Sequence, residues 1–182
     1  MSRRADMFVD IDEDPRHEPP GVGDELATLV GFLRWQRETL ELKCSGLDAT
    51  QLARRPVDPS TLSLLGLVRH MADVERGWFR RLMAGEDAPP LFYSKEDPDG
   101  EFEGAAPDPH LVTEAWAAWR GEVENADRFV ADHPLETMGE ASDPDRGPIS
   151  LRWVMVHMIE EYARHLGHAD LLRERIDGAV GQ

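Results

Sequence analysis

Apolar residues recur at every third or fourth position in four long segments of the chain, at residues 24–46, 63–84, 108–132 and 150–177. This spacing is the period of an amphipathic helix, and no segment shows the alternation of apolar and polar residues that is typical of a strand. Each predicted helix is roughly 30–40 Å long at 1.5 Å per residue. The pattern therefore predicts an all-α protein folded as a four-helix bundle.

Residue types that commonly cap or stop helices stand at the ends of these segments. The expected N-terminal caps are Asp24, Ser63 and Ser150, and the expected stops are Gly46, Gly85 and Gly178. The third helix begins either at Asp108, which precedes a proline, or at Thr113. It ends before the His133-Pro134 pair, because proline does not continue a helix.

The chain has 182 residues, enough for one domain with short ends. We expect a bundle domain at residues 23–178, preceded by a proline-containing tail or arm at residues 1–22 and followed by a tail at residues 179–182. One short turn is expected at residues 49–54. Residues 86–108 are acidic and contain several prolines, and they have neither helical nor strand period. A loop this long in a small domain is usually functional, or it crosses between distant ends of the fold.

The composition is strongly acidic. With 36 acidic and 20 basic residues, the formal net charge is −16. Such a surface repels phosphate groups, so neither nucleic acids nor anionic membranes are expected as partners. No apolar run approaches the ~20 residues that span a bilayer, and no apolar signal core follows the first residues. The single cysteine, Cys44, excludes an internal disulfide, so we expect a cytoplasmic protein.

The fourth predicted helix carries four ionisable side chains close to its apolar face. At about 100° per residue, His165 falls inside that face. Glu161, His168 and His157 fall along one edge of it. Burying a carboxylate or an imidazolium without a partner is strongly unfavourable. This line of groups therefore requires a counterpart on another helix.

Glu161 and His165 are four residues apart, the spacing by which one helix presents two metal ligands. The alternative is a solvated or hydrogen-bonded pair. On the second helix, His70 lies at the edge of the apolar stripe, where Gly66 and Gly77 leave space beside its imidazole. His70 is either a core-edge histidine bonded to a backbone carbonyl or a third ligand that completes the pair. Two histidines and one carboxylate suit a divalent cation, zinc first, with nickel or iron as alternatives.

Two stretches of the chain resemble the DinB-like superfamily. Residues 62–70, followed by Glu75 and Trp78-Phe79, resemble its second helix. Residues 161–170 resemble its fourth helix, in the branch found mainly in actinobacteria. The resemblance covers most of the predicted bundle and implies an up-down-down-up path. The long acidic loop is then the crossover between the second and third helices.

Members of this superfamily hold a divalent metal on three histidines, or on two histidines and a glutamate as in the mycothiol-dependent maleylpyruvate isomerases. By this resemblance the ligands are His70, Glu161 and His165. It also implies a thiol S-transferase or isomerase, in which a low-molecular-weight thiol such as mycothiol binds the cation and attacks an electrophilic small molecule. The thiol comes from outside the protein, so Cys44 is expected to be structural.

Three further side chains are candidates near such a site. His168 is a hydrogen-bond partner of the ligands, an acid or base, or a surface histidine, and His157 is a fourth ligand or a supporting group. Arg37, on the polar side of the first helix, is expected to be exposed, and the alternative is that it binds a carboxylate of the thiol. Two other functions stay open: a non-catalytic, stress-related metal-binding homodimer, and a metal-dependent hydrolase.

Overall fold

The computed structural model describes Val9 and residues 13–181. The long helical segments are α1 (Glu25–Cys44), α3 (Leu64–Glu75) with its π-helical continuation η2 (Arg76–Met83), α5 (Pro109–Asp132) and α6 (Leu151–Asp177). The short helices α2 (Ala49–Ala53) and α4 (Gly100–Glu103) lie in connections. Within the described residues, the β-type pairs are isolated bridges at Met138–Ser150 and Asp143–Gly147. The predicted all-α fold is confirmed.

The expected caps begin the helices. The side chains of Asp24, Ser63 and Ser150 each accept a hydrogen bond from the backbone N–H group three residues further on. The first of the two starts considered for the third helix is correct, because Asp108 caps α5 and proline fits its first turn. α6 ends at Gly178, whose φ of 83° lies in the left-handed region that favours glycine.

The second predicted helix changes character halfway along its length. α3 ends at Glu75, and from Arg76 to Met83 the chain continues with the wider turns of a π-helix. The expected stop, Gly85, follows two residues after Met83 and has a φ of 65°, in the left-handed region that favours glycine. π-helical segments are rare and occur frequently at functional sites. This one borders the pocket described below.

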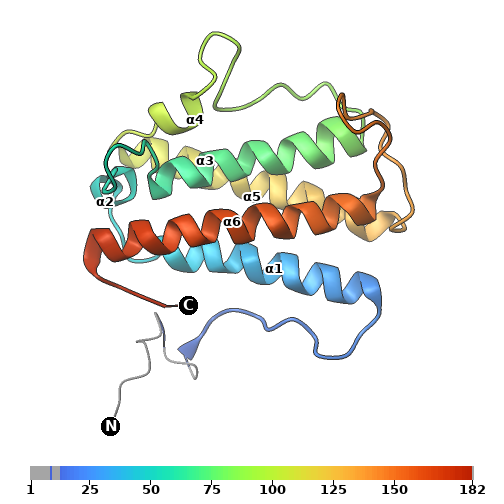
Figure 1. Ribbon diagram of the computed structural model, residues 1–182, viewed down its shortest axis with the longest axis horizontal. Helices are drawn as coiled ribbons and strands as arrows, with labels where there is room; N and C mark the ends of the chain where they lie inside the picture. The colour runs from blue at the N-terminus through green and yellow to red at the C-terminus, as the bar shows by residue number, and fades with distance from the viewer. Residues whose placement is uncertain (1–8, 10–12, 182) are drawn as a thin grey trace.

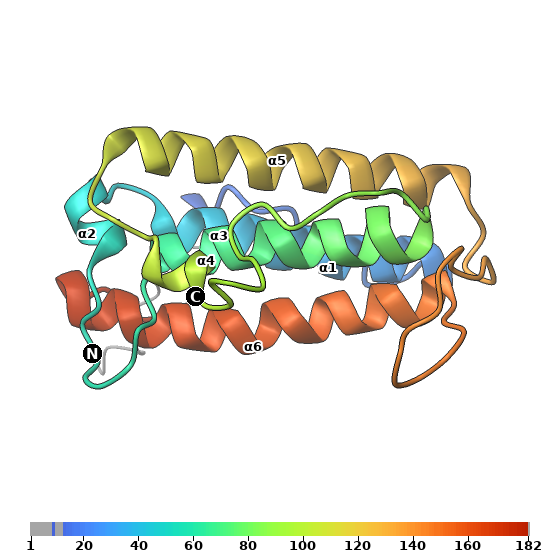
Figure 2. The same cartoon turned by 90° about the horizontal axis from the view of Figure 1, so that it is seen from above.

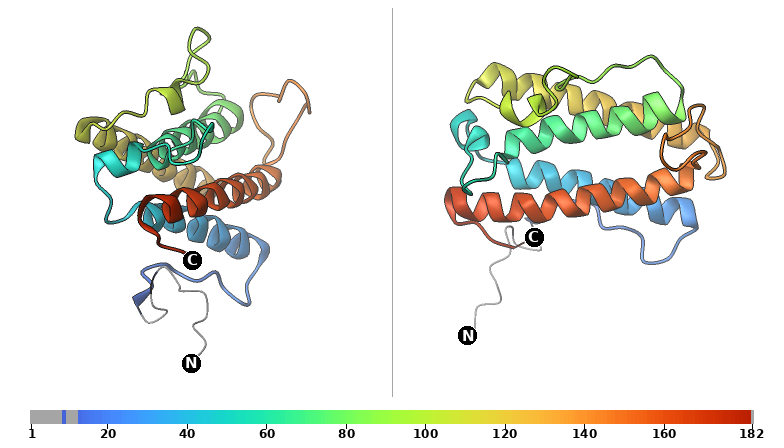
Figure 3. Two further views of the ribbon diagram at one scale, coloured as in Figure 1. Left: turned by 60° about the vertical axis from the view of Figure 1, so that its left-hand side comes forward. Right: turned by 45° about the horizontal axis from the view of Figure 1, so that its top comes forward.

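The four long helices lie side by side (Figures 1 and 2). α1 packs against α6, α6 against α3, and α3 against α5. α3 and α5 run in the same direction, so the chain returns along the bundle between them in the loop that carries α4 (Figure 3). The largest buried side chains of the core include Leu33, Leu40, Leu67, Met71, Phe79, Met155 and Tyr162. In the part of the chain that the structure describes, no helix has both the length and the apolar composition of a membrane span.

Two side chains of α3 hold the returning loop in place. Asp73 is buried and accepts hydrogen bonds from the backbone N–H groups of Leu91 and Phe92, at 2.6 and 2.9 Å. Arg69 donates to two carbonyl oxygens in α4 and lies over the Phe92 ring. Residues 86–108, for which the sequence pattern predicts no element, are therefore anchored along α3 and bring α4 against it.

Arg37 is buried, and the expectation that it is exposed is wrong. Its guanidinium donates to both carboxylate oxygens of Glu75, at 2.7 and 2.8 Å, and to Asp127. Tyr162 donates to the same Glu75 carboxylate and accepts a hydrogen bond from the indole N–H of Trp119. Burial alone lowers the pKa of Arg37, but the Glu75 carboxylate outweighs this effect and holds that pKa above its ordinary value. The polar side of α1 is thus part of a buried ionic network.

The described part of the predicted N-terminal arm lies on α1. Arg16 donates to the hydroxyl of Thr39 and lies over the Trp35 ring. The backbone N–H and the ring of His17 both contact the Glu38 carboxylate. The remaining parts of the predicted tails, residues 1–8, 10–12 and 182, lie outside the described residues.

Candidate metal centre

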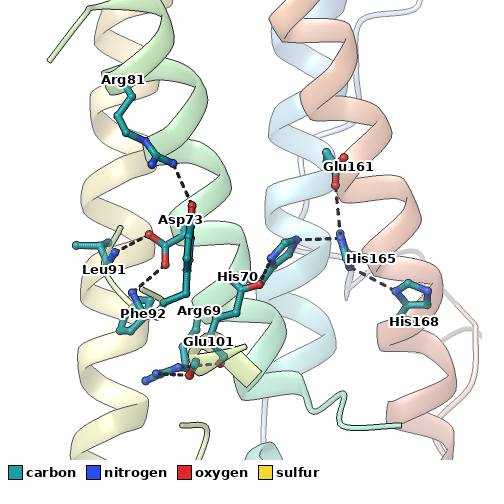
Figure 4. A network of polar contacts seen from close by, with 12 residues as sticks. Arg69, His70, Asp73, Arg81, Leu91, Phe92, Glu101, Glu161, His165 and His168 are labelled. Atoms are coloured by element: carbon teal, nitrogen blue, oxygen red, sulfur yellow. Dashed lines mark hydrogen bonds and ion pairs between the residues drawn. The ribbon is translucent and has the colours of Figure 1, made fainter. Parts of the chain in front are cut away.

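His70 on α3 and the pair Glu161 and His165 on α6 come together between the two helices (Figure 4). One ligand atom from each side chain lies within 4.8 Å of the other two. The Nε2 atoms of the two histidines are 3.1 Å apart, and the Nε2 atom of His165 lies 3.5 Å from an Oε atom of Glu161. The packing of α6 on α3 therefore supplies the counterpart that the line of ionisable groups on α6 requires.

These separations suit the coordination of a small cation. Two ligands at the corners of a tetrahedron with bonds of about 2.0–2.1 Å lie roughly 3.3 Å apart. The observed separations of 3.1 and 3.5 Å lie on either side of that value. Two imidazole nitrogens and one carboxylate oxygen form a donor set that zinc, nickel and iron all accept. The residues present therefore fit a divalent cation with three protein ligands.

Glu101 orients the imidazole of His70. Its carboxylate lies 2.8 Å from the Nδ1 atom of His70 and accepts a hydrogen bond from it. This hydrogen bond occupies the Nδ1 atom of His70 and leaves its Nε2 atom facing His165. The ring of Phe102 stacks on the same imidazole, with centroids 5.5 Å apart. Sequence reasoning missed Glu101 because it is one of several carboxylates in a stretch without periodicity.

His165 is uncharged at neutral pH. Burial lowers its pKa to about 4, and the neighbouring His70, His168 and Arg164 add to the shift. The neutral imidazole is the form that binds a metal ion. The ring is therefore ready to act as a ligand without first losing a proton.

A pocket of about 490 Å³ opens beside His70. It is lined by residues of α3 and η2 together with residues of the returning loop, among them Val74, Trp78, Leu82, Tyr93, Pro98 and Glu101. The apolar spacing assigns Val74 and Trp78 to the core, but both are only partly buried and border the pocket. The cavity thus joins an apolar wall to the polar side chains around His70.

Two glycines allow close approach to the helix that carries His70. A Cβ atom on Gly66 would come within 2.9 Å of the Phe102 ring. A Cβ atom on Gly77 would come within 2.8 Å of the Arg81 guanidinium. The space expected beside His70 is therefore filled in part by Phe102 and Arg81, and the remainder belongs to the pocket.

The family model of the mycothiol-S-transferases matches residues 28–178, from α1 to the end of α6. The chain belongs to the mycothiol-S-transferase family. This is a DinB-like family of actinobacterial type, so the resemblance drawn from the two helical motifs is confirmed. Neither a curated protein nor a solved structure matches the chain.

In this member of the mycothiol-S-transferase family, His157 supports Glu161 from one side. Its ring stacks on Trp153, with centroids 4.8 Å apart, and meets the ring of Trp78 edge-on. Its Nε2 atom lies 3.5 Å from an Oε atom of Glu161. His157 thus contacts a candidate ligand without joining the cluster of the three ligand atoms.

His168 and Arg37 lie in different surroundings. The Nδ1 atom of His168 is 3.4 Å from the Nδ1 atom of His165, so His168 contacts the ring edge that points away from His70. Arg37 is bound to Glu75 in the core, and its hydrogen bonds and ion pairs with the described residues include none of the three candidate ligands. The structure therefore places His168 beside the candidate ligand His165, outside the cluster of the three ligand atoms, and Arg37 away from the candidate centre.

Cys44 is expected to be unreactive in the native protein. It is buried at the end of α1, and burial raises its pKa to about 12. Because the thiolate is the reactive form, iodoacetamide at pH 8 should leave the native protein unmodified and label it in denaturant, as measured by intact mass spectrometry. Rapid labelling of the native protein would contradict this prediction.

Proposed function

We propose that the chain is a metal-dependent thiol S-transferase that joins mycothiol to an electrophilic small molecule. The observation that carries this proposal is the convergence of His70, Glu161 and His165, of which His70 lines a pocket, in a chain of the mycothiol-S-transferase family. These three side chains are the ligands of a divalent cation, for which zinc is the first choice and nickel and iron are the alternatives.

The chemistry is the transfer of a thiol sulfur to carbon. His70, Glu161 and His165 would hold a divalent cation, whose charge would lower the pKa of a bound thiol and so supply a thiolate at neutral pH. The thiol proton passes to solvent, the sulfur forms a bond to the electrophilic carbon, and the leaving group departs with its bonding electrons. Glu101 holds His70 in one orientation, and Val74 and Trp78 give the electrophile an apolar wall.

The proposal includes the path of the chain. We infer an up-down-down-up bundle of DinB-like type over residues 23–178, with the loop at residues 86–108 as the crossover between the second and third long helices. The packing of α6 against α3 supports it, because this contact lets His70 face the two ligands on α6.

A conjugation assay on the zinc-loaded protein tests the function. The protein is incubated with mycothiol and 1-chloro-2,4-dinitrobenzene, and the thioether product is followed by its absorbance. We expect product only when protein, thiol and metal are all present, and we expect mycothiol to slow the removal of the metal by a chelator.

Two other results would point to other functions. Stoichiometric metal without turnover of any pair of thiol and electrophile would favour the non-catalytic, stress-related homodimer. Cleavage of an ester or an amide without a thiol would favour a hydrolase, in which the open coordination position activates water.

Glu101→Gln is expected to weaken metal binding by about 10–100-fold, because a carboxylate that accepts a hydrogen bond from a ligating histidine orients it and raises its basicity. Competition with a chelator of known affinity measures the effect. The matched control is Glu103→Gln, which removes an exposed carboxylate from the same short helix. Because the amide oxygen of Gln can still accept from His70, equal metal affinity in the two variants would mean that the negative charge of Glu101 does not strengthen His70 as a ligand.

A further inference from the structure

Arg81 differs from the other arginines of η2 in its surroundings. Arg76 and Arg80 donate to Glu122 on α5, at 2.7 and 2.6 Å. Arg81 lines the pocket instead. Its hydrogen bond within the described residues is a long one, 3.4 Å, to the hydroxyl of Tyr93, and no carboxylate of those residues forms an ion pair with it.

The guanidinium of Arg81 is turned back along the helix toward the candidate metal centre. It lies over Gly77, where a Cβ atom would come within 2.8 Å of its Nη2 atom. Figure 4 shows the side chain directed from Arg81 toward the level of Asp73. Gly77 follows His70 by seven positions, which is about 10 Å along a helix. The charge is therefore held two turns from His70, inside the same pocket.

The carboxylates that border this pocket already have partners. Asp73 accepts two backbone N–H groups of the returning loop, and Glu101 accepts from His70. Asp143 accepts two backbone N–H groups of its own turn. Burial raises the pKa of Asp73 and the nearby charge of Arg81 offsets part of that rise, but the described residues show no ion pair between the two side chains. The N–H groups of Arg81 are therefore open to an anion that enters the pocket, and hydrogen bonds to such an anion are among the strong ones.

We propose that Arg81, with the Tyr93 hydroxyl beside it, binds a carboxylate of the electrophilic co-substrate. This rests on the proposed function, which places the reacting carbon near His70 at the other end of the pocket. Between the two ends the wall contains Val74 and Trp78. The site therefore selects an elongated substrate with an apolar body, a carboxylate at one end and an electrophilic carbon about 10 Å away.

A matched pair of electrophiles tests the charge requirement. In 4′-(chloromethyl)biphenyl-4-carboxylate, the carboxylate and the reacting carbon stand at opposite ends of a rigid apolar body, and the primary amide is its neutral counterpart. With either compound the mycothiol sulfur displaces chloride, which leaves with the C–Cl electrons, and the thiol proton passes to solvent. We expect zinc-loaded protein to use the carboxylate with a kcat/KM about tenfold or more above that for the amide.

Three variants test the assignment to Arg81. Arg81→Gln is expected to lose the preference for the carboxylate. Arg80→Gln makes the same charge change at the next position and is expected to keep it, because Arg80 faces Glu122. Gly77→Ala keeps the arginine but puts a methyl group where the guanidinium lies, so it is expected to lose most of the preference while remaining folded. If the unchanged protein and all three variants show the same ratio of kcat/KM for the carboxylate over the amide, the proposal is wrong.

Binding of the unreactive 4′-methylbiphenyl-4-carboxylate provides a readout other than turnover. Trp78 borders the pocket, so quenching of tryptophan fluorescence reports the binding. We expect Arg81→Gln to raise the Kd about tenfold and Arg80→Gln to leave it unchanged. If Arg81→Gln raises the Kd in this way but the protein does not conjugate thiols, the anion site is supported and the proposed function is wrong. If the protein conjugates thiols and Arg81→Gln leaves the Kd unchanged, only the anion site is wrong.

A further experiment tests whether Arg81 binds a carboxylate of the electrophile or a carboxylate of the thiol. Glutathione, which has carboxylates of its own, is used with the neutral amide as electrophile. We expect Arg81→Gln to leave this reaction unchanged. A tenfold loss here, with no loss for mycothiol and the biphenyl carboxylate, would assign the anion to the thiol and overturn the assignment to the electrophile.

Discussion

His70→Ala and His165→Ala are each expected to abolish stoichiometric metal binding and thiol conjugation while leaving the helices intact. Each substitution removes one of the two imidazole nitrogens that face each other 3.1 Å apart, so a cation keeps only two protein ligands. Loss of a hydrogen-bonding partner outside the ligands typically lowers metal affinity by about 10–100-fold, and loss of a ligand is expected to lower it further. Elemental analysis after gel filtration measures the metal, and circular dichroism measures the helix content.

The matched control is His110→Ala, which removes an exposed imidazole at the start of α5. This variant is expected to keep its full metal content and activity. Glu161→Gln should behave like the two histidine variants, because it replaces the anionic ligand with a neutral amide. Full metal retention in both His70→Ala and His165→Ala would show that the cation is bound elsewhere.

The positions of the long helices could be predicted because an amphipathic stripe and its cap are local features. Ser63 caps α3 with its own hydroxyl, whatever the rest of the fold does. The change to π-type hydrogen bonding at Arg76 could not be predicted in this way. Trp78 and Leu82 are four positions apart, and that spacing is consistent with a regular helix as well as with the observed one. The spacing of apolar residues indicates which face of a helix is buried, but it does not indicate whether the backbone hydrogen bonds are of the α or the π type.

The candidate site could be predicted as far as it is built on helix faces. Glu161 and His165 lie one turn apart on α6, so their proximity follows from the sequence spacing. Glu101 reaches His70 only because the long loop returns along α3, which no local pattern encodes. The expectation that Arg37 is exposed is wrong for a related reason. Whether a polar helix face meets solvent or a buried carboxylate depends on the neighbouring helix.

Arg37→Met is expected to lower the free energy of unfolding by about 3–5 kcal/mol, the usual effect of removing one partner of a buried ion pair. Glu75 is fully buried, and Arg37 supplies two of its hydrogen bonds. Without the guanidinium, the one hydrogen bond left to the carboxylate from the described residues is that of Tyr162, and its charge has lost its ion-pair partner in the core. Urea unfolding followed by circular dichroism measures the change. The metal content of the folded protein should not change, because Arg37 contacts none of the candidate ligands.

Two further proteins show whether the unpaired charge is the cause. In Arg37→Met/Glu75→Gln the amide oxygen can still accept from Tyr162 and no charge remains, so the double variant should recover much of the lost stability. Arg152→Met breaks exposed ion pairs with Glu25 and Glu136 and should change stability by no more than about 1 kcal/mol. If Arg37→Met and Arg152→Met have equal effects, the buried network does not stabilise the bundle. If the double variant is as unstable as Arg37→Met, the loss comes from packing around Arg37 and not from the charge of Glu75.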